Sequence, residues 1–314
     1  MLLKMKSVVR FLPILLPVIS VFLIILCISG MQKDSAANQK VEPKPLYISG
    51  YAIPDTLEFA GEKVPMNYFD VKENLDREFQ VNSYWQSQTI LIIKRAGRFF
   101  PIIDSILKKN GIPLDFKYMA VAESGLQNVV SPSNAVGFWQ FLKPTAKESG
   151  LEVNDYVDER YHLEKSTEAA CKFLKESYNL FGNWTTAAAS YNEGRQAISK
   201  QLEYQKENNY YNLSLFDETS RYIYRMISFK QIMEHPQKYG FSINNECLYK
   251  PYKYNEISVD SSITNLADFA IKQGANYKTL KILNPWLRNH SLPNKSHKLY
   301  MIKIPSNGFR ETND

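Results

Sequence analysis

One short stretch, residues 113–125, most constrains the fold of this 314-residue chain, because it places a carboxylate on an apolar face. The pattern predicts a helix, since a proline suits its first turn and a glycine suits its end. At helical spacing Phe116, Met119 and Ala120 form an apolar stripe, and Glu123 follows on the same stripe. Burial of a carboxylate favours its protonated form and raises its pKa. Glu123 is therefore a candidate general acid, and the alternative is a helix-end glutamate that reaches water.

Four motifs follow Glu123-Ser124 at wide spacing, and each is weak by itself. They are Ser131-Pro132, Gly137-Phe138-Trp139-Gln140-Phe141, Ser190-Tyr191-Asn192-Glu193-Gly194 and Glu218-Thr219-Ser220-Arg221-Tyr222-Ile223. In this order and at these spacings the set resembles the soluble lytic transglycosylase domain family, part of a lysozyme-like superfamily. The chain is most similar to the membrane-bound lytic murein transglycosylase D group, and the resemblance runs from about residue 96 to residue 235.

The resemblance implies an enzyme that cuts the β-1,4 bond between N-acetylmuramic acid and N-acetylglucosamine in bacterial peptidoglycan. Ordinary glycosidases need a second carboxylate as nucleophile or base, but the family needs only one. Glu123 would first protonate the glycosidic oxygen and then accept a proton from the muramyl 6-hydroxyl, which closes onto C1. The product would be a 1,6-anhydro sugar end, formed without water. No cofactor and no metal take part in this scheme.

The resemblance also implies six substrate-site residues, which are Ser131, Gly137, Gln140, Tyr191, Asn192 and Tyr222. The loop serine and the glutamine would hydrogen-bond the sugar, and the glycine would let the backbone approach it. The tyrosine–asparagine pair would line the cleft near the acid. The hydroxyl of the last tyrosine would orient or assist the acid.

Two alternatives stay open beside this scheme. A hydrolase of the goose-type lysozyme kind requires Glu193 or Glu218 to activate water opposite Glu123. Glu193 is expected at a helix end facing outward, and Glu218 at a helix start, where a carboxylate suits the dipole. Neither is therefore expected across the sugar. A non-catalytic wall-binding protein is the other alternative, and the intact motifs argue against it.

Charge and cysteine usage narrow the partners. The chain has 38 Lys and Arg against 32 Asp and Glu, a net charge of +6 that suits peptidoglycan or an anionic membrane surface. No basic cluster or nucleic-acid motif is present. The four histidines are scattered and no Cys-x-x-Cys pair occurs, so a metal site is not expected. A Cys171–Cys247 disulfide is possible, and two free thiols are the alternative.

The first 30 residues predict a membrane anchor or a signal segment. Three basic residues precede an apolar run from Phe11 to Ile28, a pattern that places the rest of the chain outside the cytoplasm. The run is just long enough to span a bilayer, which favours an uncleaved anchor over a cleaved signal. The predicted location is the bacterial periplasm or cell envelope. Residues 31–80 are expected to be a tether and an irregular extension.

The remaining chain predicts a mainly α protein with two domains. Residues 81–245 show helical periodicity and form the expected lysozyme-like catalytic domain, with Asn183 and Asp217 as candidate helix caps. Residues 250–306 predict a strand, two short helices and a second strand. This βααβ unit resembles a LysM module, a small peptidoglycan-binding fold. The family's Gly-Asp-Thr turn is replaced by residues 261–264, so ligand binding by this module stays open.

Overall fold

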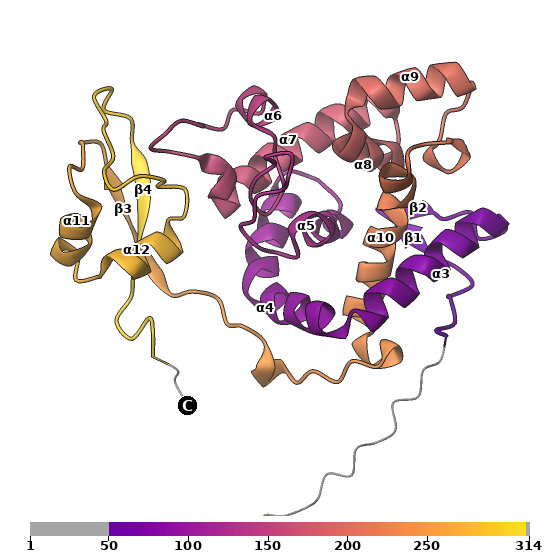
Figure 1. Ribbon diagram of the computed structural model, residues 1–314, viewed down its shortest axis with the longest axis horizontal. Coiled ribbons are helices and arrows are strands. Elements are labelled where there is room, and N and C mark those ends of the chain that lie inside the picture. The colour runs from indigo at the N-terminus through magenta and orange to yellow at the C-terminus, as the bar shows by residue number, and fades with distance from the viewer. Residues whose placement is uncertain (1–49, 312–314) are drawn as a thin grey trace, which may run out of the picture. The chain divides into compact units, whose positions relative to one another are not determined.

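The computed structural model describes residues 50–311, and helices dominate them (Figure 1). The predicted mainly α class is confirmed. The helices of the larger, N-terminal part are α3 (Phe69–Tyr84), α4 (Gln86–Lys109), α5 (Lys117–Ser124), α6 (Lys143–Glu148), α7 (Leu163–Phe181), α8 (Trp184–Glu193), α9 (Arg195–Gln205) and α10 (Asp217–Glu234). A small hairpin of β1 (Glu58–Phe59) and β2 (Glu62–Lys63) precedes them.

The stretch that carries Glu123 is shorter as a helix than the sequence predicts. A single 3₁₀ turn, Leu114–Phe116, comes first, and α5 covers only Lys117–Ser124. Gly125 ends the helix in the left-handed conformation, at φ 59°, where a residue without a side chain is favoured. Asn183 caps α8 as predicted, because its side chain accepts a hydrogen bond from the Thr186 N–H. Asp217 is not a cap but the first residue of α10.

Helix α5 lies inside the helical domain, in contact with α4 and α10 (Figure 1). Its apolar stripe is fully buried: Phe116, Met119 and Ala120 are each 0% exposed. Helix α10 packs against α3, α5 and α8, and it contributes Tyr222 and Met226 to the same core. The helix that carries Glu123 is therefore held on several sides, which fixes the direction in which its last turn points.

The segment before α3 joins this core, although its sequence pattern is irregular. Leu57, Phe59 and Val64 are buried in the cluster that also holds the α5 residues. Two carboxylates tie the hairpin to distant elements. Glu62 accepts hydrogen bonds from the backbone N–H groups of Trp184 and Thr185, at the start of α8.

The second tie is a buried ion pair. Asp115 accepts a hydrogen bond of 2.7 Å from the Ala60 N–H and pairs with Lys230 at 2.8 Å. The two side chains are only 17% and 10% exposed. Removing one partner of such a pair would leave a buried charge. Because the Ala60 N–H is bonded to the same Asp115 carboxylate, the hairpin is tied to the core of the helical domain.

The C-terminal module has the predicted βααβ order. It consists of β3 (Tyr254–Val259), α11 (Leu266–Lys272), α12 (Tyr277–Leu283) and β4 (Tyr300–Pro305). Strands β3 and β4 are antiparallel, with Val259 opposite Tyr300. Leu266, Leu280 and Ile302 are fully buried in a core of its own.

One segment of the helical domain, residues 156–164, contacts the C-terminal module directly. Val157 forms a β-bridge with Leu287 and belongs to the module's apolar core. The Asp158 N–H donates to the Trp286 carbonyl at 2.9 Å. Lys303 of β4 pairs with Glu164 of α7. The contact therefore combines backbone hydrogen bonds, an apolar seam and an ion pair.

The predicted membrane segment and the predicted cysteine pair have different outcomes. The apolar run from Phe11 to Ile28 lies outside the described residues. Between residues 50 and 311, no helix is both long enough and apolar enough to cross a membrane. Cys171 is buried and Cys247 is exposed, and both are free thiols.

Candidate active site

A cavity of about 480 Å³ opens beside the last turn of α5, and it gathers most of the predicted site residues. Five of the seven line it: Glu123, Ser131, Gln140, Tyr191 and Asn192. These residues come from α5, the loop after it and α8. We call this space the catalytic cavity.

Glu123 is the titratable centre of the catalytic cavity. Its side chain is partly buried, and the Tyr222 hydroxyl donates a hydrogen bond to Oε1. Burial raises the pKa of Glu123 to about 7, although the bond from Tyr222 lowers it. The negative charge of Glu218 raises this pKa further, and the positive charge of Arg225 lowers it. Near neutral pH the carboxyl group therefore exists in both forms, as a group that gives and then takes a proton requires.

Two tyrosines beside Glu123 stay protonated. Burial, followed by the charge of Glu123, raises the pKa of both Tyr191 and Tyr222 well above its ordinary value. Tyr191 donates its hydroxyl proton to the Trp139 carbonyl at 2.8 Å. Tyr222 is 1% exposed, does not line the catalytic cavity, and reaches the site only through Glu123. Tyr222 therefore contacts Glu123 from the protein interior and not from the cavity.

Asn192 is oriented by a residue absent from the predicted site. Its Oδ1 accepts a hydrogen bond of 2.7 Å from the hydroxyl of Thr219, which is 3% exposed. This bond fixes the amide, so that its NH₂ group remains available to the cavity. Thr219 follows Glu218 within the fourth motif, and that position was the only sequence signal for it.

The loop after α5 is held by its own polar groups. Ser131 Oγ accepts a hydrogen bond of 3.0 Å from the Ala135 N–H. The Gln140 side-chain amide donates to the carbonyls of Gly137, at 2.7 Å, and Val129, at 3.1 Å. In this structure the Ser131 hydroxyl and the Gln140 NH₂ group therefore shape the loop as well as facing the cavity.

Gly137 does not line the catalytic cavity. Its φ is +87°, and a Cβ at this position would lie 2.1 Å from the Arg160 carbonyl oxygen. The glycine is needed for close backbone packing against Arg160 and for its left-handed conformation.

Arg160 is a second residue that the motifs do not reveal. Its guanidinium is almost buried and donates to the carbonyls of Asn134 and Phe141, both at 3.2 Å. Asp158 neutralises it through two bonds, Nη2 to Oδ2 at 2.7 Å and Nε to Oδ1 at 2.9 Å. Arg160 thus clamps both sides of the loop that carries Ser131 and Gln140, and a lone Asp-x-Arg pattern gives no sequence signal for that contact.

The three aromatic residues of the second motif are mainly core. Phe138, Trp139 and Phe141 are 4%, 0% and 3% exposed, and only Phe141 lines the catalytic cavity. Trp139 donates its indole N–H to the Thr167 hydroxyl at 2.9 Å. They stabilise the loop more than they offer a platform for sugar.

A second carboxylate reaches the catalytic cavity. Glu218 is exposed and lines it, whereas Glu193 does not. The Glu193 Oε2 atom is instead buried, with no hydrogen-bond partner among the described residues. Of the two candidate bases for hydrolysis, the structure brings only Glu218 into the lining. Residues 50–311 hold no group of three or more His, Cys, Asp or Glu side chains able to bind a metal ion.

Comparison with known proteins gives a family match that includes Glu123 and the first three motifs, whereas the fourth motif lies beyond it. Residues 101–214 match the family model described as "Transglycosylase SLT domain". Residues 255–308 match "Soluble lytic transglycosylase C-terminal LysM-like domain". The chain is 23% identical over 256 residues to "Membrane-bound lytic murein transglycosylase D" of Escherichia coli strain K12, covering 79% of this chain and 55% of that protein. It therefore spans about half the length of that curated relative.

Two solved structures are also similar. The lytic transglycosylase Slt of Pseudomonas aeruginosa, as an inactive mutant, gives a TM-score of 0.38 at 18% identity, over 48% of this chain and 26% of that one. The 70 kDa soluble lytic transglycosylase of Escherichia coli gives 0.37 at 18% identity, with the same coverage. The two family matches confirm the resemblance drawn from the motifs: one stretch of the chain is similar to a transglycosylase SLT domain, and the other to a LysM-like C-terminal domain of the soluble lytic transglycosylase type.

Proposed function

We propose that this protein is a peptidoglycan lytic transglycosylase, in which Glu123 serves first as acid and then as base. The observation that carries this proposal is the state of Glu123: partly buried, bonded to Tyr222, and with a pKa raised to about 7 by burial. A carboxyl group at that pKa is half protonated at neutral pH. It can protonate the glycosidic oxygen and remain a competent base for the next step.

In the proposed reaction the C1–O4 bond breaks as Glu123 gives its proton to the leaving 4-hydroxyl of N-acetylglucosamine. The sugar's N-acetyl group stabilises the positive charge that develops at C1. The muramyl 6-hydroxyl then attacks C1 and returns its proton to Glu123. An intramolecular hydroxyl can have an effective molarity of about 10⁵ M or more, which lets it compete with water. The end product is a 1,6-anhydromuramyl residue.

Substrate contacts are proposed for the residues around the acid. The Asn192 amide, fixed by Thr219, and the loop groups of Ser131 and Gln140 would hydrogen-bond the sugar. Tyr222 would keep donating its hydrogen bond to Glu123 whether Glu123 is protonated or ionised, because the pKa of Tyr222 is raised well above its ordinary value. Gly137 would act indirectly, by allowing the loop to pack on Arg160.

A hydrolase is the second candidate, because Glu218 lines the same cavity. Its side chain is exposed, and a carboxylate in such a place could activate water. An intact carboxylate opposite the acid is what an inverting glycosidase uses. The two candidates give different products, so one experiment separates them.

The test is digestion of purified peptidoglycan in ¹⁸O-water, followed by mass spectrometry of the released fragments. The transglycosylase reaction gives muramyl ends that lack one water and carry no ¹⁸O. Reducing muramyl ends labelled with ¹⁸O would replace this proposal with the hydrolase. Glu218→Gln is the matched variant, since it should abolish labelled ends only if hydrolysis occurs.

The cellular setting is also a proposal. The LysM-like domain and the name of the Escherichia coli relative support a location in the bacterial cell envelope, with peptidoglycan as partner. Residues 1–30 would supply attachment to the membrane. Fractionation of cells, with and without residues 1–30 in the chain, tests the attachment: the shortened chain should leave the membrane fraction.

A further inference from the structure

A second cavity of about 480 Å³ lies where the helical domain meets the C-terminal module. Its walls come from α4, from residues 126–129 and 161–164, from residues 249–254, and from α12 with the residues after it, together with Phe138 and with Lys303 of β4. None of its lining residues lines the catalytic cavity. We call this space the interdomain cavity, and the proposed reaction makes no use of it.

The interdomain cavity carries an excess of positive charge. Four cationic side chains line it, Arg95, Arg98, Lys281 and Lys303, against one carboxylate, Glu164. That carboxylate is already in an ion pair with Lys303. The three remaining cations have no acidic residue in the lining left to balance them, so the cavity suits an anion.

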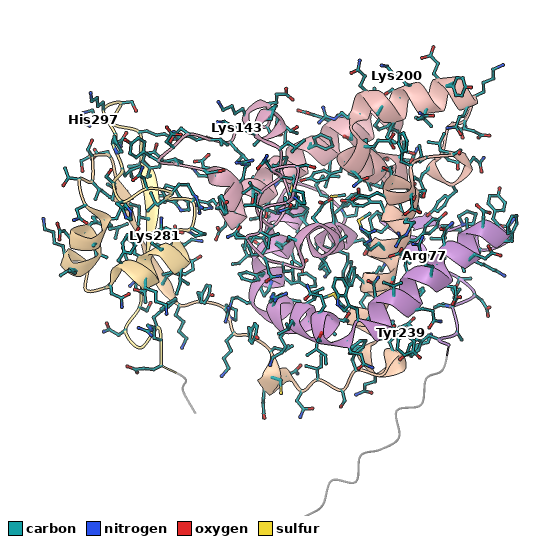
Figure 2. All side chains as sticks on the ribbon, in the orientation of Figure 1. Arg77, Lys143, Lys200, Tyr239, Lys281 and His297 are labelled. Carbon is teal, nitrogen blue, oxygen red and sulfur yellow. The ribbon has the colours of Figure 1, made fainter. Side chains whose placement is uncertain are left out.

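Lys281 and Arg98 are the cations best placed to meet such an anion. Lys281, which lies on α12 and is labelled in Figure 2, donates from Nζ to the Leu287 carbonyl, and two of its three N–H groups are left for a ligand. Burial and then the charge of Arg288 lower its pKa, so an anion beside it would relieve an unfavourable charge. Arg98 donates from Nε to the Lys250 carbonyl and from Nη1 to the Tyr252 hydroxyl, both at 2.9 Å. Its Nη2 group is left for a ligand.

Aromatic rings make up much of the remaining wall. The ring centre of Tyr252 lies 4.2 Å from the Arg98 guanidinium carbon, and the ring centre of Tyr249 lies 5.2 Å from it. The cation is therefore held by contacts with aromatic rings as well as by hydrogen bonds. Trp286 is 3% exposed, and its indole Nε1 has no hydrogen-bond partner among the described residues. A buried N–H that lacks an acceptor costs free energy, and a ligand that reached it with an acceptor would recover that cost.

We propose that the interdomain cavity binds the stem peptide of peptidoglycan, with its carboxylates on Arg98 and Lys281 and its amide planes against the aromatic wall. This rests on peptidoglycan being the substrate. The stem peptide fits better than the glycan backbone, because the free carboxylates of the peptide match the charge of the cavity and the N-acetylated disaccharide offers few.

The interdomain cavity is also connected to the catalytic helix. Arg95 lines it and donates from Nη1 to the Gly125 carbonyl at 3.1 Å, at the end of α5. The residues next along the chain, 126–129, form part of the cavity wall. A stem peptide bound there would lie against the segment that continues from Glu123, so recognition of the peptide and positioning of the acid would share one piece of backbone.

The test uses the full chain with Glu123→Gln, to prevent turnover, labelled with 5-fluorotryptophan. The chain has four tryptophans, and Trp286→Phe assigns the ¹⁹F resonance of interest. The probe is the reduced disaccharide tetrapeptide, and the matched probe is the same disaccharide without peptide. We expect the tetrapeptide to shift the Trp286 resonance and the peptide-free disaccharide to leave it in place. Trp184, which lines neither cavity, is the internal reference.

Charge variants then identify the anion contacts. Arg98→Gln and Lys281→Gln should each weaken tetrapeptide binding at this resonance about tenfold, as expected for a hydrogen bond to a charged group. Lys200→Gln is the matched control, because Lys200 is exposed on α9 and labelled in Figure 2. Circular dichroism and an unchanged Trp184 resonance verify that each variant is folded.

Three results would overturn the proposal: an unmoved Trp286 resonance at saturating tetrapeptide, an equal shift with the peptide-free disaccharide, or unchanged affinity in both charge variants. These results are independent of the reaction product. Anhydro ends without a Trp286 response would refute only the stem-peptide site. A Trp286 response with ¹⁸O-labelled reducing ends would refute only the transglycosylase reaction.

Discussion

Glu123 and Glu164 are both partly buried glutamates of the helical domain, yet their pKa values move in opposite directions. Burial raises the pKa of Glu123 to about 7. Burial acts in the same direction on Glu164, but a hydrogen bond from His162 and the charge of Lys303 bring its pKa down to about 2. The first lies in the catalytic cavity and the second at the contact with the C-terminal module.

The difference lies in the partners. Tyr222 gives Glu123 one neutral hydroxyl, whereas Glu164 has Lys303 on Oε1 and His162 Nδ1 at 3.2 Å from Oε2. A cation in contact stabilises the ionised carboxylate and a structural bond results. A neutral hydroxyl donor stabilises the ionised carboxylate less, so Glu123 can both give and take a proton near neutral pH. Substitutions at Glu123, Glu164 and Tyr222 test this difference between the two glutamates.

The largest effect is expected for activity in Glu123→Gln. The amide keeps the shape of the side chain but can neither donate nor accept the proton, so peptidoglycan cleavage should fall by about 10²–10⁴-fold. Turbidity clearance of a peptidoglycan suspension measures this. Glu203→Gln, at an exposed position of α9, is the matched control and should keep wild-type activity. A folded Glu123→Gln protein with wild-type clearance would remove Glu123 from the mechanism.

The same substitution should stabilise the fold. A carboxyl group with a folded pKa of about 7 and an ordinary value of 4.5 binds its proton more tightly when folded. Ionising it therefore lowers stability as pH rises from 4.5 to 7, by about 3 kcal/mol at most. Glu123→Gln should raise the free energy of unfolding by up to this amount at pH 8 and by little near pH 4.5. Urea unfolding at the two pH values checks it, and equal gains at both would contradict the raised pKa.

Glu164→Gln should have the opposite effect. The depressed pKa of Glu164 means that its contribution is present above pH 4.5 and is lost as pH falls toward 2. At pH 7 the variant should lose about 2–3 kcal/mol, most clearly in the unfolding of the C-terminal module. At pH 2 it should match the wild type. Glu203→Gln, at the exposed position of α9, is again the control, and a wild-type unfolding curve for Glu164→Gln at pH 7 would show that the ion pair contributes nothing.

The smallest effect is expected for Tyr222→Phe. Its hydroxyl lowers the pKa of Glu123 against the effect of burial, so removing it should raise that pKa above 7. The alkaline limb of the kcat/KM profile should move to higher pH, and the rate at pH 7 should fall about tenfold, the value of one hydrogen bond to a charged group. Tyr204→Phe, at an exposed tyrosine, provides the comparison. If the alkaline limb of the kcat/KM profile does not shift, a group other than Glu123 controls that limb.

The parts of this site that sequence reasoning located are those with local signals. Glu123 stood out because it interrupts an apolar stripe, and Ser131, Gln140, Tyr191 and Asn192 stood out by motif order. The Asn183 cap and the βααβ order of the module followed from local pattern in the same way. The division at residues 81 and 250 stays a prediction.

The residues that could not be located act through contacts between distant parts of the chain. Arg160 and Thr219 support the site by hydrogen bonds to elements that the sequence does not place beside them. Residues 114–116 form a 3₁₀ turn because Pro113 has an extended ψ of 138°, which delays the helix. The β1–β2 hairpin has strands of two residues, too short for an alternating pattern to be visible.

The Glu62 carboxylate at the start of α8 also has a consequence for how the candidate site forms. It lies 122 residues before Trp184 and accepts a hydrogen bond from the Trp184 N–H, so the start of the helix that carries Tyr191 and Asn192 gains this contact only after a very long loop has closed. Contacts of such sequence separation form late, because the entropy of closing the loop precedes any gain from the contact. A chain emerging from the ribosome would therefore lack this contact until α8 itself has been made. The candidate site would gain its full set of contacts only late in folding.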